Sequence, residues 1–310
     1  LIRLPSVQNF VVGKVTGYLE QKLGTTVDIG HINISFPKKL VLENVYFEDQ
    51  SRDTLIAGEK LSVDIDMFKL LNNTVEIQEL ELKGITAKIN RSLPDSSFNF
   101  DYILKAFTTE KKSTATADSS AALLFDIDDV LFERIHFVYT DDVIGTSADI
   151  RLNKFDTKVE KFDLTKNMAF HMPTVNIDGL QAIVKQWAPI TAENAPSASD
   201  FGLVDSSKSV AASSLLPDIG IKKVNLSNIF VQYEDASSAI KTKFDVQKLN
   251  AAIDEIDLNK EIVRLKEIAL DGSESEVFLG KIQKVKSTPS ESKPINWVVS
   301  ADKLLINKTN

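Results

Sequence analysis

The residues that could perform acid–base chemistry or bind a metal are few and scattered. The chain has three histidines, His31, His136 and His171, and no cysteine. None of the histidines has a second histidine at ligand spacing, and the absence of cysteine excludes thiolate zinc sites, disulfides and cysteine nucleophiles. We therefore predict a structural or surface role for the histidines.

The remaining polar motifs do not complete a reactive site. Asp126, Asp128 and Asp129 supply oxygen ligands, but the Gly and the terminal Glu of a calcium loop are missing, so a wet strand face is the simpler interpretation. Trp187 and Trp297 are expected to pack rather than to stack on a ligand. No phosphate-binding loop and no G-x-S-x-G motif occurs. The sequence predicts a protein that is not an enzyme and has no cofactor and no metal.

The composition is that of a folded chain with an acidic balance. Of 310 residues, 43% are hydrophobic and 26% are charged, with a formal net charge of -8. This balance argues against general affinity for nucleic acid or for anionic lipid headgroups. No stretch is apolar over the roughly 20 residues that a spanning helix needs. The abrupt ends indicate a segment of a longer protein.

One helix is predicted over residues 1–24. Its apolar residues follow helical spacing, Pro5 suits a first turn and Gly24 suits the end. The apolar positions are Val7, Phe10, Val11, Val15, Tyr18, Leu19 and Leu23. A second, short helix is predicted over Phe98–Phe107.

After the first helix the apolar residues alternate, and two patterns recur about every 94 residues. The first pattern contains a two-residue skip that predicts a β-bulge or a bend in the strand. It comprises Leu40, Leu42, Val45 and Phe47; Val130, Phe132, Ile135, Phe137 and Tyr139; and Val224, Leu226, Ile229, Val231 and Tyr233. The second pattern ends in a glycine. It comprises Val75, Ile77, Leu80, Leu82 and Gly84; Phe170, Met172, Val175, Ile177 and Gly179; and Val263, Leu265, Ile268, Leu270 and Gly272.

These repeats divide the chain into units of about five strands each. The predicted divisions are residues 25–122, 123–216 and 217–292, with a truncated fourth unit at 293–310. Strand Leu61–Phe68 and polar turns at Asn72–Asn73, Lys166–Asn167 and Asn259–Lys260 fit the scheme. The low-complexity stretches Thr108–Ala121 and Ala188–Ser214 are predicted loops.

The predicted fold is mainly β: an N-terminal amphipathic helix followed by a curved, elongated antiparallel groove of tandem units. Few elements are available to cover the apolar side of so many strands, which favours a hydrophobic ligand in the groove. A closed β-sandwich, in which the faces pack together, is the alternative. The candidate lining residues are Leu42, Val45, Phe47, Val63, Ile65, Ile77, Leu80, Leu82, Phe132, Ile135, Phe137, Tyr139, Met172, Val175, Ile177, Leu226, Ile229, Val231, Tyr233, Leu265, Ile268 and Leu270.

The first 90 residues resemble the TamB family, the inner-membrane subunit of the translocation and assembly module, in its Bacteroidetes-type form. The resemblance rests on the helix that begins PSVQ, on the G-x-x-V-x-I-G turn at Gly24–Gly30 and on L-x-N-V-x-F-x-D at Leu42–Asp49. AsmA-like proteins share this N-terminal organisation. Beyond these residues the similarity is architectural and rests on the repeat.

The resemblance implies a periplasmic location, an inner-membrane anchor before this segment, and a bridge-type β-groove that carries phospholipid toward the outer membrane. It also implies an Omp85-type outer-membrane barrel as a partner of a C-terminal domain that these residues do not include. Three functions stay open: a lipid-conducting groove, a scaffold for assembly and secretion of outer-membrane proteins by β-augmentation, and a structural tandem β-sandwich stalk.

Overall fold

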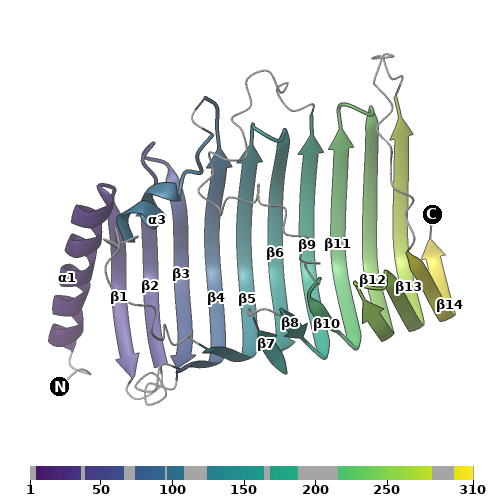
Figure 1. Cartoon of the computed structure of the whole chain (residues 1–310), viewed down its shortest axis with the longest axis horizontal. Helices are drawn as coiled ribbons and strands as arrows, with labels where there is room; N and C mark the ends of the chain where they lie inside the picture. Colours follow the sequence, from purple (N-terminus) through teal and green to yellow (C-terminus); the bar gives the residue numbers. More distant parts are fainter. Residues whose placement is uncertain are drawn as a thin grey trace, which may run out of the picture.

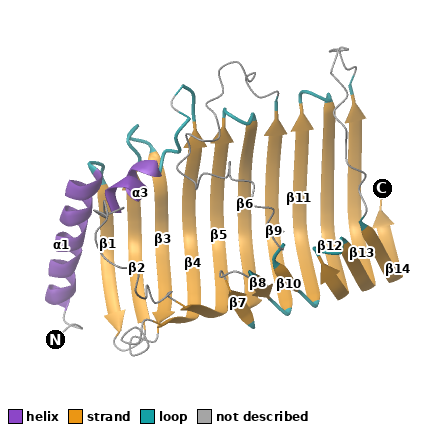
Figure 2. Cartoon of the chain, in the orientation of Figure 1, coloured by secondary structure: helices purple, strands orange, loops and turns teal. Residues whose placement is uncertain are grey.

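The computed structural model describes most of the chain in eight segments. They are residues 5–35, 39–65, 74–94, 96–107, 124–163, 168–187, 216–280 and 297–309. Within them the protein is mainly β, with two helices, an 11-stranded sheet and a 3-stranded sheet. The long strands lie side by side in one layer, with α1 at one end of the row and β14 at the other (Figures 1 and 2).

The described elements have the following bounds. The helices are α1 (Pro5–Leu23) and α3 (Asp101–Phe107). The strands of the large sheet are β1 (Val27–Ser35), β2 (Lys39–Glu48), β3 (Thr54–Ile65), β4 (Thr74–Arg91), β5 (Leu124–Asp141), β6 (Thr146–Lys158), β9 (Thr174–Gln186), β11 (Lys223–Asp235), β12 (Ile240–Asp257), β13 (Ile262–Leu279) and β14 (Val298–Thr309). The small sheet holds β7 (Lys161–Asp163), β8 (Ala169–His171) and β10 (Asp218–Gly220).

Both predicted helices are present, and their ends have local causes. Gly24 adopts a left-handed conformation with φ 70°, and its N–H donates to the Glu20 carbonyl at 2.8 Å, which closes α1. At α3 the Asp101 carboxylate accepts the Phe98 N–H at 2.9 Å and so holds the chain that enters the first turn.

The large sheet is mixed, which corrects the prediction of an antiparallel one. Its order is β1-β2-β3-β4-β5-β6-β9-β11-β12-β13-β14. The pairs β4/β5, β9/β11 and β13/β14 are parallel, and the other neighbours are antiparallel. Four long strands, β1 to β4, precede the first parallel junction, and three lie between successive junctions: β5, β6 and β9, then β11 to β13. At each junction the next strand starts at the same end of the sheet as the strand before it, so the two run in the same direction.

The number of strands in a unit depends on whether its long strands are interrupted. Within residues 123–216 the structure describes five strands, β5 to β9, because the chain leaves the large sheet after Lys158 and returns at Thr174. Pro173 stands at this return and has no N–H to continue a ladder. In the next unit β12 and β13 each run unbroken over 18 residues, so four strands, β10 to β13, are described there.

The two-residue skips are local irregularities that line up across the sheet. The residue within each skip has a left-handed backbone: Asn44 (φ 53°), Arg134 (φ 53°) and Asn228 (φ 54°). The recurring glycines have the same conformation: Gly84 (φ 60°), Gly179 (φ 66°) and Gly272 (φ 68°). All of these residues lie at one level across the sheet, where the facing residues of neighbouring strands are not paired. We call this level the unpaired row. The pairing register does not shift at this level, because neighbouring strands pass over the same number of residues. The skips are therefore aligned left-handed residues and not β-bulges with an extra residue in one strand.

A buried core exists at the α1 end of the sheet. Ile29, Ile32 and Val45 are each 4% exposed and pack together. Side chains on both sides of the skip in β2 join this cluster, so the residue within the skip keeps them on one face. Val11, Val12, Val15, Ile34, Leu40, Leu42, Phe47 and Leu61 pack against it. The apolar side of α1 thus covers these side chains at the β1 end of the sheet.

Several predictions concern residues outside the described segments. These are the loops Thr108–Ala121 and Ala188–Ser214, the turns Asn72–Asn73 and Lys166–Asn167, and the end of strand Leu61–Phe68 beyond Ile65. The turn at Asn259–Lys260 is present between β12 and β13. In the described segments, no helix has the length and apolar character needed to cross a membrane.

Candidate functional site: the apolar face of the large sheet

One row of directly paired residues is apolar in every strand of the large sheet. Residues that face each other across paired strands project to the same side of a sheet. The row runs Ile32, Leu42, Leu61, Leu82, Phe132, Phe155, Ile177, Leu226, Leu249, Leu270 and Ile306. We call it the apolar row. The Phe132 and Phe155 rings stack within it, with centroids 5.4 Å apart.

Parallel rows on the same face extend this surface. One contains Ile34, Leu40, Val63, Leu80, Val130, Thr157, Val175, Val224, Ala251, Ile268 and Leu304. Its single hydroxyl, that of Thr157, donates to the carbonyls of Lys158 (3.0 Å) and Thr174 (2.9 Å). Beyond the unpaired row, another contains Val27, Phe47, Ile56, Ala87, Phe137, Ile150, Ala182, Val231 and Phe244. Together these rows form the apolar face.

Strand pairing places most of the predicted lining residues on this face. Tyr139 and Tyr233 lie in a further row, in which Ala148 and Val184 stand between them. Val45, Ile135 and Ile229 flank the unpaired row, and Ile65, Ile77 and Leu265 lie near the strand ends beyond irregularities in register. Met172 lies between β8 and β9, where its N–H donates to the Gly220 carbonyl at 2.7 Å, so it belongs to the small-sheet region.

Most of this face is neither buried nor fully exposed. Among the predicted lining residues only Val45, Val175 and Ile229 are buried, and all the others are partly exposed. Exposure is highest near β14, where Ile306 is 56% exposed. The only other sheet in the described segments has three short strands and cannot cover eleven long ones.

The neighbouring row on the opposite face is polar in every strand. It runs His31, Glu43, Lys60, Lys83, Glu133, Lys154, Asp178, Ser227, Lys248, Asp271 and Asn307. We call this row the polar row, and the side of the sheet on which it lies the polar face. The two faces therefore differ in kind along the whole sheet, as expected for a sheet with one solvated side.

Ion pairs tie neighbouring strands on the polar face. Lys60 lies 2.6 Å from Glu81, and Lys83 lies 3.0 Å from Glu133 across the parallel β4/β5 junction. The hydrogen bond from Lys83 is the main cause that lowers the pKa of Glu133. Such exposed pairs are worth little stability individually. Their consequence is a strongly hydrated surface on this side.

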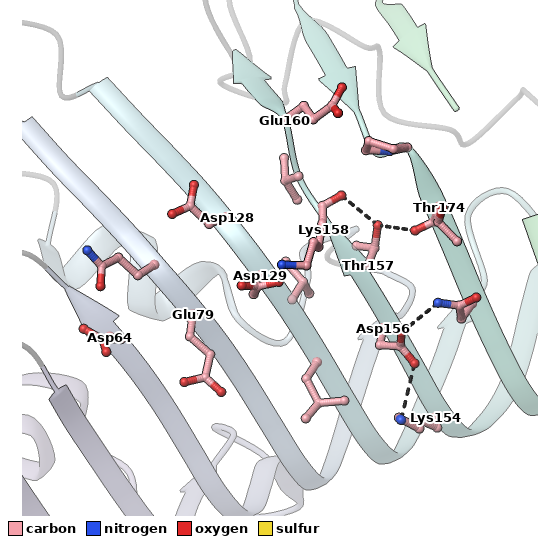
Figure 3. A pocket seen from close by; sticks show the side chains of 16 residues that line it. Asp64, Glu79, Asp128, Asp129, Lys154, Asp156, Thr157, Lys158, Glu160 and Thr174 are labelled. Atoms are coloured by element: carbon pink, nitrogen blue, oxygen red, sulfur yellow. Dashed lines mark hydrogen bonds and ion pairs between the residues drawn. The ribbon is translucent and has the colours of Figure 1, made fainter. Parts of the chain in front are cut away.

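A depression of about 1180 Å³ lies along β3 to β9 and is lined mainly by charged and polar residues, together with Val130 and Thr157 of the apolar face. Figure 3 shows its charged side chains, among them Glu79, Asp129, Lys154 and Asp156. Lys158 pairs with Asp129 at 3.5 Å, and Asn176 donates to Asp156 at 2.7 Å. None of the predicted lining residues lines this depression.

The residues first considered for chemistry lie apart from one another. His136 pairs with Asp149 at 3.2 Å, and His171 pairs with Asp218 at 2.8 Å. Asp128 and Asp129 line the polar depression. In the segments that the structure describes, no cluster of three or more His, Cys, Asp or Glu residues is placed to hold a metal ion.

Sequence reasoning gave no role to an aspartate that recurs in the three units. It stands two positions after the last aromatic residue of each strand that carries the two-residue skip. Asp49, Asp141 and Asp235 each accept backbone N–H groups of the turn that follows. Aspartate is suited to such turns because its carboxylate can satisfy amides two or three residues onward. The common spacing from Phe47, Tyr139 and Tyr233 was the available signal.

Asp141 is the most enclosed of the three. It has no exposed surface, and Arg91 lies 2.5 Å and the donating Tyr139 hydroxyl 2.7 Å from its Oδ2. Its Oδ1 accepts the N–H groups of Val143 (3.0 Å) and Ile144 (3.2 Å). Burial alone would raise the pKa of Asp141, but the Arg91 guanidinium and the other donors outweigh it and hold the pKa below the usual 3.8.

Sequence reasoning also omitted the middle strands of the second and third units. Phe155 and Leu152 of β6 and Leu249 of β12 belong to the apolar face by pairing. The alternation around Asn153 changes phase at the unpaired row, which hid these residues from a simple period of two. The polar face could have revealed them, because its charges alternate in the same strands.

In comparisons with known proteins, no family model and no curated protein matches the chain.

Proposed function

We propose that the chain binds phospholipid acyl chains along the apolar face and conducts them along the sheet, without performing a chemical reaction. The apolar row carries this proposal, because it offers a large apolar side chain in each of the eleven strands of the large sheet. Strands stand about 4.8 Å apart, so the row extends over roughly 48 Å. A lipid moving along it would meet apolar contacts throughout.

Partition supplies the physical basis of such carriage. Each buried CH₂ group gains about 0.8 kcal/mol, so an acyl chain against the apolar face recovers much of what it loses on leaving a bilayer. The partial exposure of Phe132, Ile177 and Leu226 leaves area for these contacts. Because the contacts involve only methylene and aromatic groups, we expect little selectivity among headgroups, which stay in water.

The proposed shape is a groove with the apolar face inside. The unpaired row supports it, because left-handed residues at one level in many strands bend them together. The resemblance to the TamB family adds the proposed setting: a periplasmic segment tethered to the inner membrane, carrying phospholipid toward the outer membrane and acting with an Omp85-type barrel through regions beyond these residues.

Lipid co-purification tests the proposal. The protein is expressed in the presence of bilayers and its bound lipid is measured by native mass spectrometry and by extraction. We expect bound phospholipid, and we expect Phe137→Asp combined with Ile177→Asp to lose it, since both side chains lie on the apolar face.

The matched control places the same charges on the other face of the same strands. Val138→Asp combined with Ile183→Asp changes β5 and β9 on the polar face, where these residues pair with Asp149. This variant is expected to keep its lipid. Protein that stays free of lipid after incubation with liposomes would instead favour the assembly scaffold or the stalk.

A further inference from the structure

The outward side of α1 carries an aromatic and basic stripe. Phe10, Lys14, Tyr18 and Lys22 recur at every fourth residue, and Phe10 and Tyr18 are 65% and 56% exposed. Residues four apart on an α-helix are neighbours, separated by about 40° of rotation. The four side chains therefore form one band that winds around the helix.

The band continues onto α3. Lys22 Nζ lies 5.5 Å from the centroid of the Phe107 ring, and Lys14 Nζ lies 5.7 Å from that of Phe10. Phe107 and Leu104 are themselves 48% and 59% exposed. We call the band and these two residues of α3 the helix patch. At about 100° per residue, the middle of the band lies roughly a quarter turn around α1 from Val11, Val12 and Val15, which pack on the core.

The helix patch contains lysine but no carboxylate. The nearby acids are directed elsewhere: Glu20 accepts the Val27 N–H at 3.4 Å, Asp101 accepts the Phe98 N–H, and Glu48 accepts the Thr26 hydroxyl at 2.7 Å. The whole chain is acidic, but salt screens charges beyond about 8 Å at physiological ionic strength. Within α1 and α3, the three lysines Lys14, Lys22 and Lys105 outnumber the two acids, Glu20 and Asp101, so the two helices together carry a positive charge.

Exposed aromatic rings alternating with lysines are typical of helices that lie in the interface of a bilayer. The rings enter the boundary between headgroups and acyl chains, and the lysines extend toward anionic headgroups. We propose that the helix patch docks on the surface of a bilayer that contains anionic phospholipids. This docking is separate from lipid carriage, because the patch and the apolar face involve different residues.

The position of α1 gives the docking a geometric consequence. The helix lies alongside β1, at one end of the row of strands, with its axis along the strands (Figure 1). When the helix patch lies on a bilayer, α1 holds the β1 end of the row of strands next to the surface. The β1 end of the apolar face then lies near the bilayer.

Co-sedimentation with vesicles measures the docking. The full chain is mixed with vesicles of phosphatidylcholine alone and of phosphatidylcholine with phosphatidylglycerol, at low and high salt. We expect binding to the anionic vesicles that weakens as salt rises. Lys14→Glu combined with Lys22→Glu is expected to weaken it at least about tenfold, because each lysine near an anionic surface contributes on the order of a fivefold gain. Phe10→Ser combined with Tyr18→Ser is expected to weaken binding to both kinds of vesicle.

Matched controls separate docking from carriage. Lys158→Glu combined with Lys266→Glu makes the same charge change at exposed sites on β6 and β13, and is expected to bind like the unchanged protein. Phe137→Asp combined with Ile177→Asp, which should abolish carriage, is also expected to dock. Equal binding by the two lysine variants, binding that ignores anionic lipid, or no binding at all overturns the proposal. So does self-association that Phe10→Ser abolishes, since that outcome assigns the patch to a second copy.

Discussion

At the scale of single residues, the most constrained position is the aspartate that ends the strand with the two-residue skip in the second unit. Asp141 joins Arg91 at the end of β4, Tyr139 in its own strand and two amides of the following turn. Arg91 is only 12% exposed in its side chain, so each charge depends on the other. Removing one partner from such a pair leaves a buried charge without compensation.

We expect Asp141→Ala to lower the free energy of unfolding by about 3 kcal/mol, because the Arg91 guanidinium loses its ion pair in a buried position. Urea unfolding followed by circular dichroism measures the change. The control is Asp235→Ala, which loses turn contacts at the equivalent position but is less enclosed. An equal loss in the two variants would contradict the importance given to burial.

The same carboxylate predicts a dependence on acid. Its pKa is lower in the folded protein than the 3.8 of the unfolded chain, so its contribution to stability is complete above 3.8 and disappears as pH falls through the lowered value. We expect Asp141→Asn to unfold with a shallower loss of stability below pH 3.8 than the unchanged protein. Parallel slopes in that range would show that Asp141 is not a source of the acid sensitivity.

At the scale of elements, the glycines of the unpaired row have a steric role. A Cβ at Gly179 would stand 2.7 Å from Asn153 Cβ of the adjacent strand, and the residue has φ 66°. Both the contact and the conformation oppose any other side chain. The glycine thus lets β6 and β9 stay close where the register passes over one residue.

We expect Gly179→Ala to destabilise the protein by about 1–3 kcal/mol through this strain. Gly13→Ala is the contrasting substitution, because Gly13 lies in α1 with nothing within 4 Å of the added Cβ. There alanine should stabilise by about 0.5–1 kcal/mol. Thermal unfolding of both variants gives the signs, and stabilisation by Gly179→Ala would refute the steric explanation.

Contacts at the parallel junctions hold successive units together. Asp178 of β9 accepts the Ser227 hydroxyl at 2.7 Å and the Asn228 side-chain amide at 2.8 Å, both from β11. We expect Asp178→Ala to weaken this junction by about 1 kcal/mol and to raise amide exchange in β11. Asp149→Ala, whose contacts stay within the second unit, should leave exchange in β11 unchanged.

These elements also show how far the sequence could predict the fold. The skip at Asn44 and the glycine at Gly84 are local signals, because a change in alternation and a left-handed residue are visible in one strand. The parallel pairing of β4 with β5 is not local: it depends on how the chain returns between units, and the linkers have no periodic pattern. Asn153 is marked by the change of alternation between Leu152 and Phe155 but by no glycine, and its strand partners place it in the unpaired row.

At the scale of the whole molecule, the sheet is one surface with two chemically different sides. Each strand contributes one residue to the apolar row and one to the polar row, although the units differ in length and in interruptions. A β-sheet transmits register from strand to strand, so a pattern repeated in sequence becomes a continuous track in space. Continuity across the junctions is therefore the property that distinguishes a conducting surface from a set of separate binding sites.

We expect a lipid to be found along the entire track. A photo-crosslinking amino acid placed at Phe47 in β2, Phe137 in β5 or Val231 in β11 should capture phospholipid in each case, since all three belong to one row of the apolar face. The same probe at Tyr46, Val138 or Gln232, the adjacent positions on the polar face, should capture little. Capture at the first site alone would indicate one binding pocket near α1, and the proposed conduction along the sheet would then be wrong. Capture at all three sites, together with its loss at Val231 when Phe137 and Ile177 are replaced by Asp, would show that lipid reaches the far units by passing over the middle one.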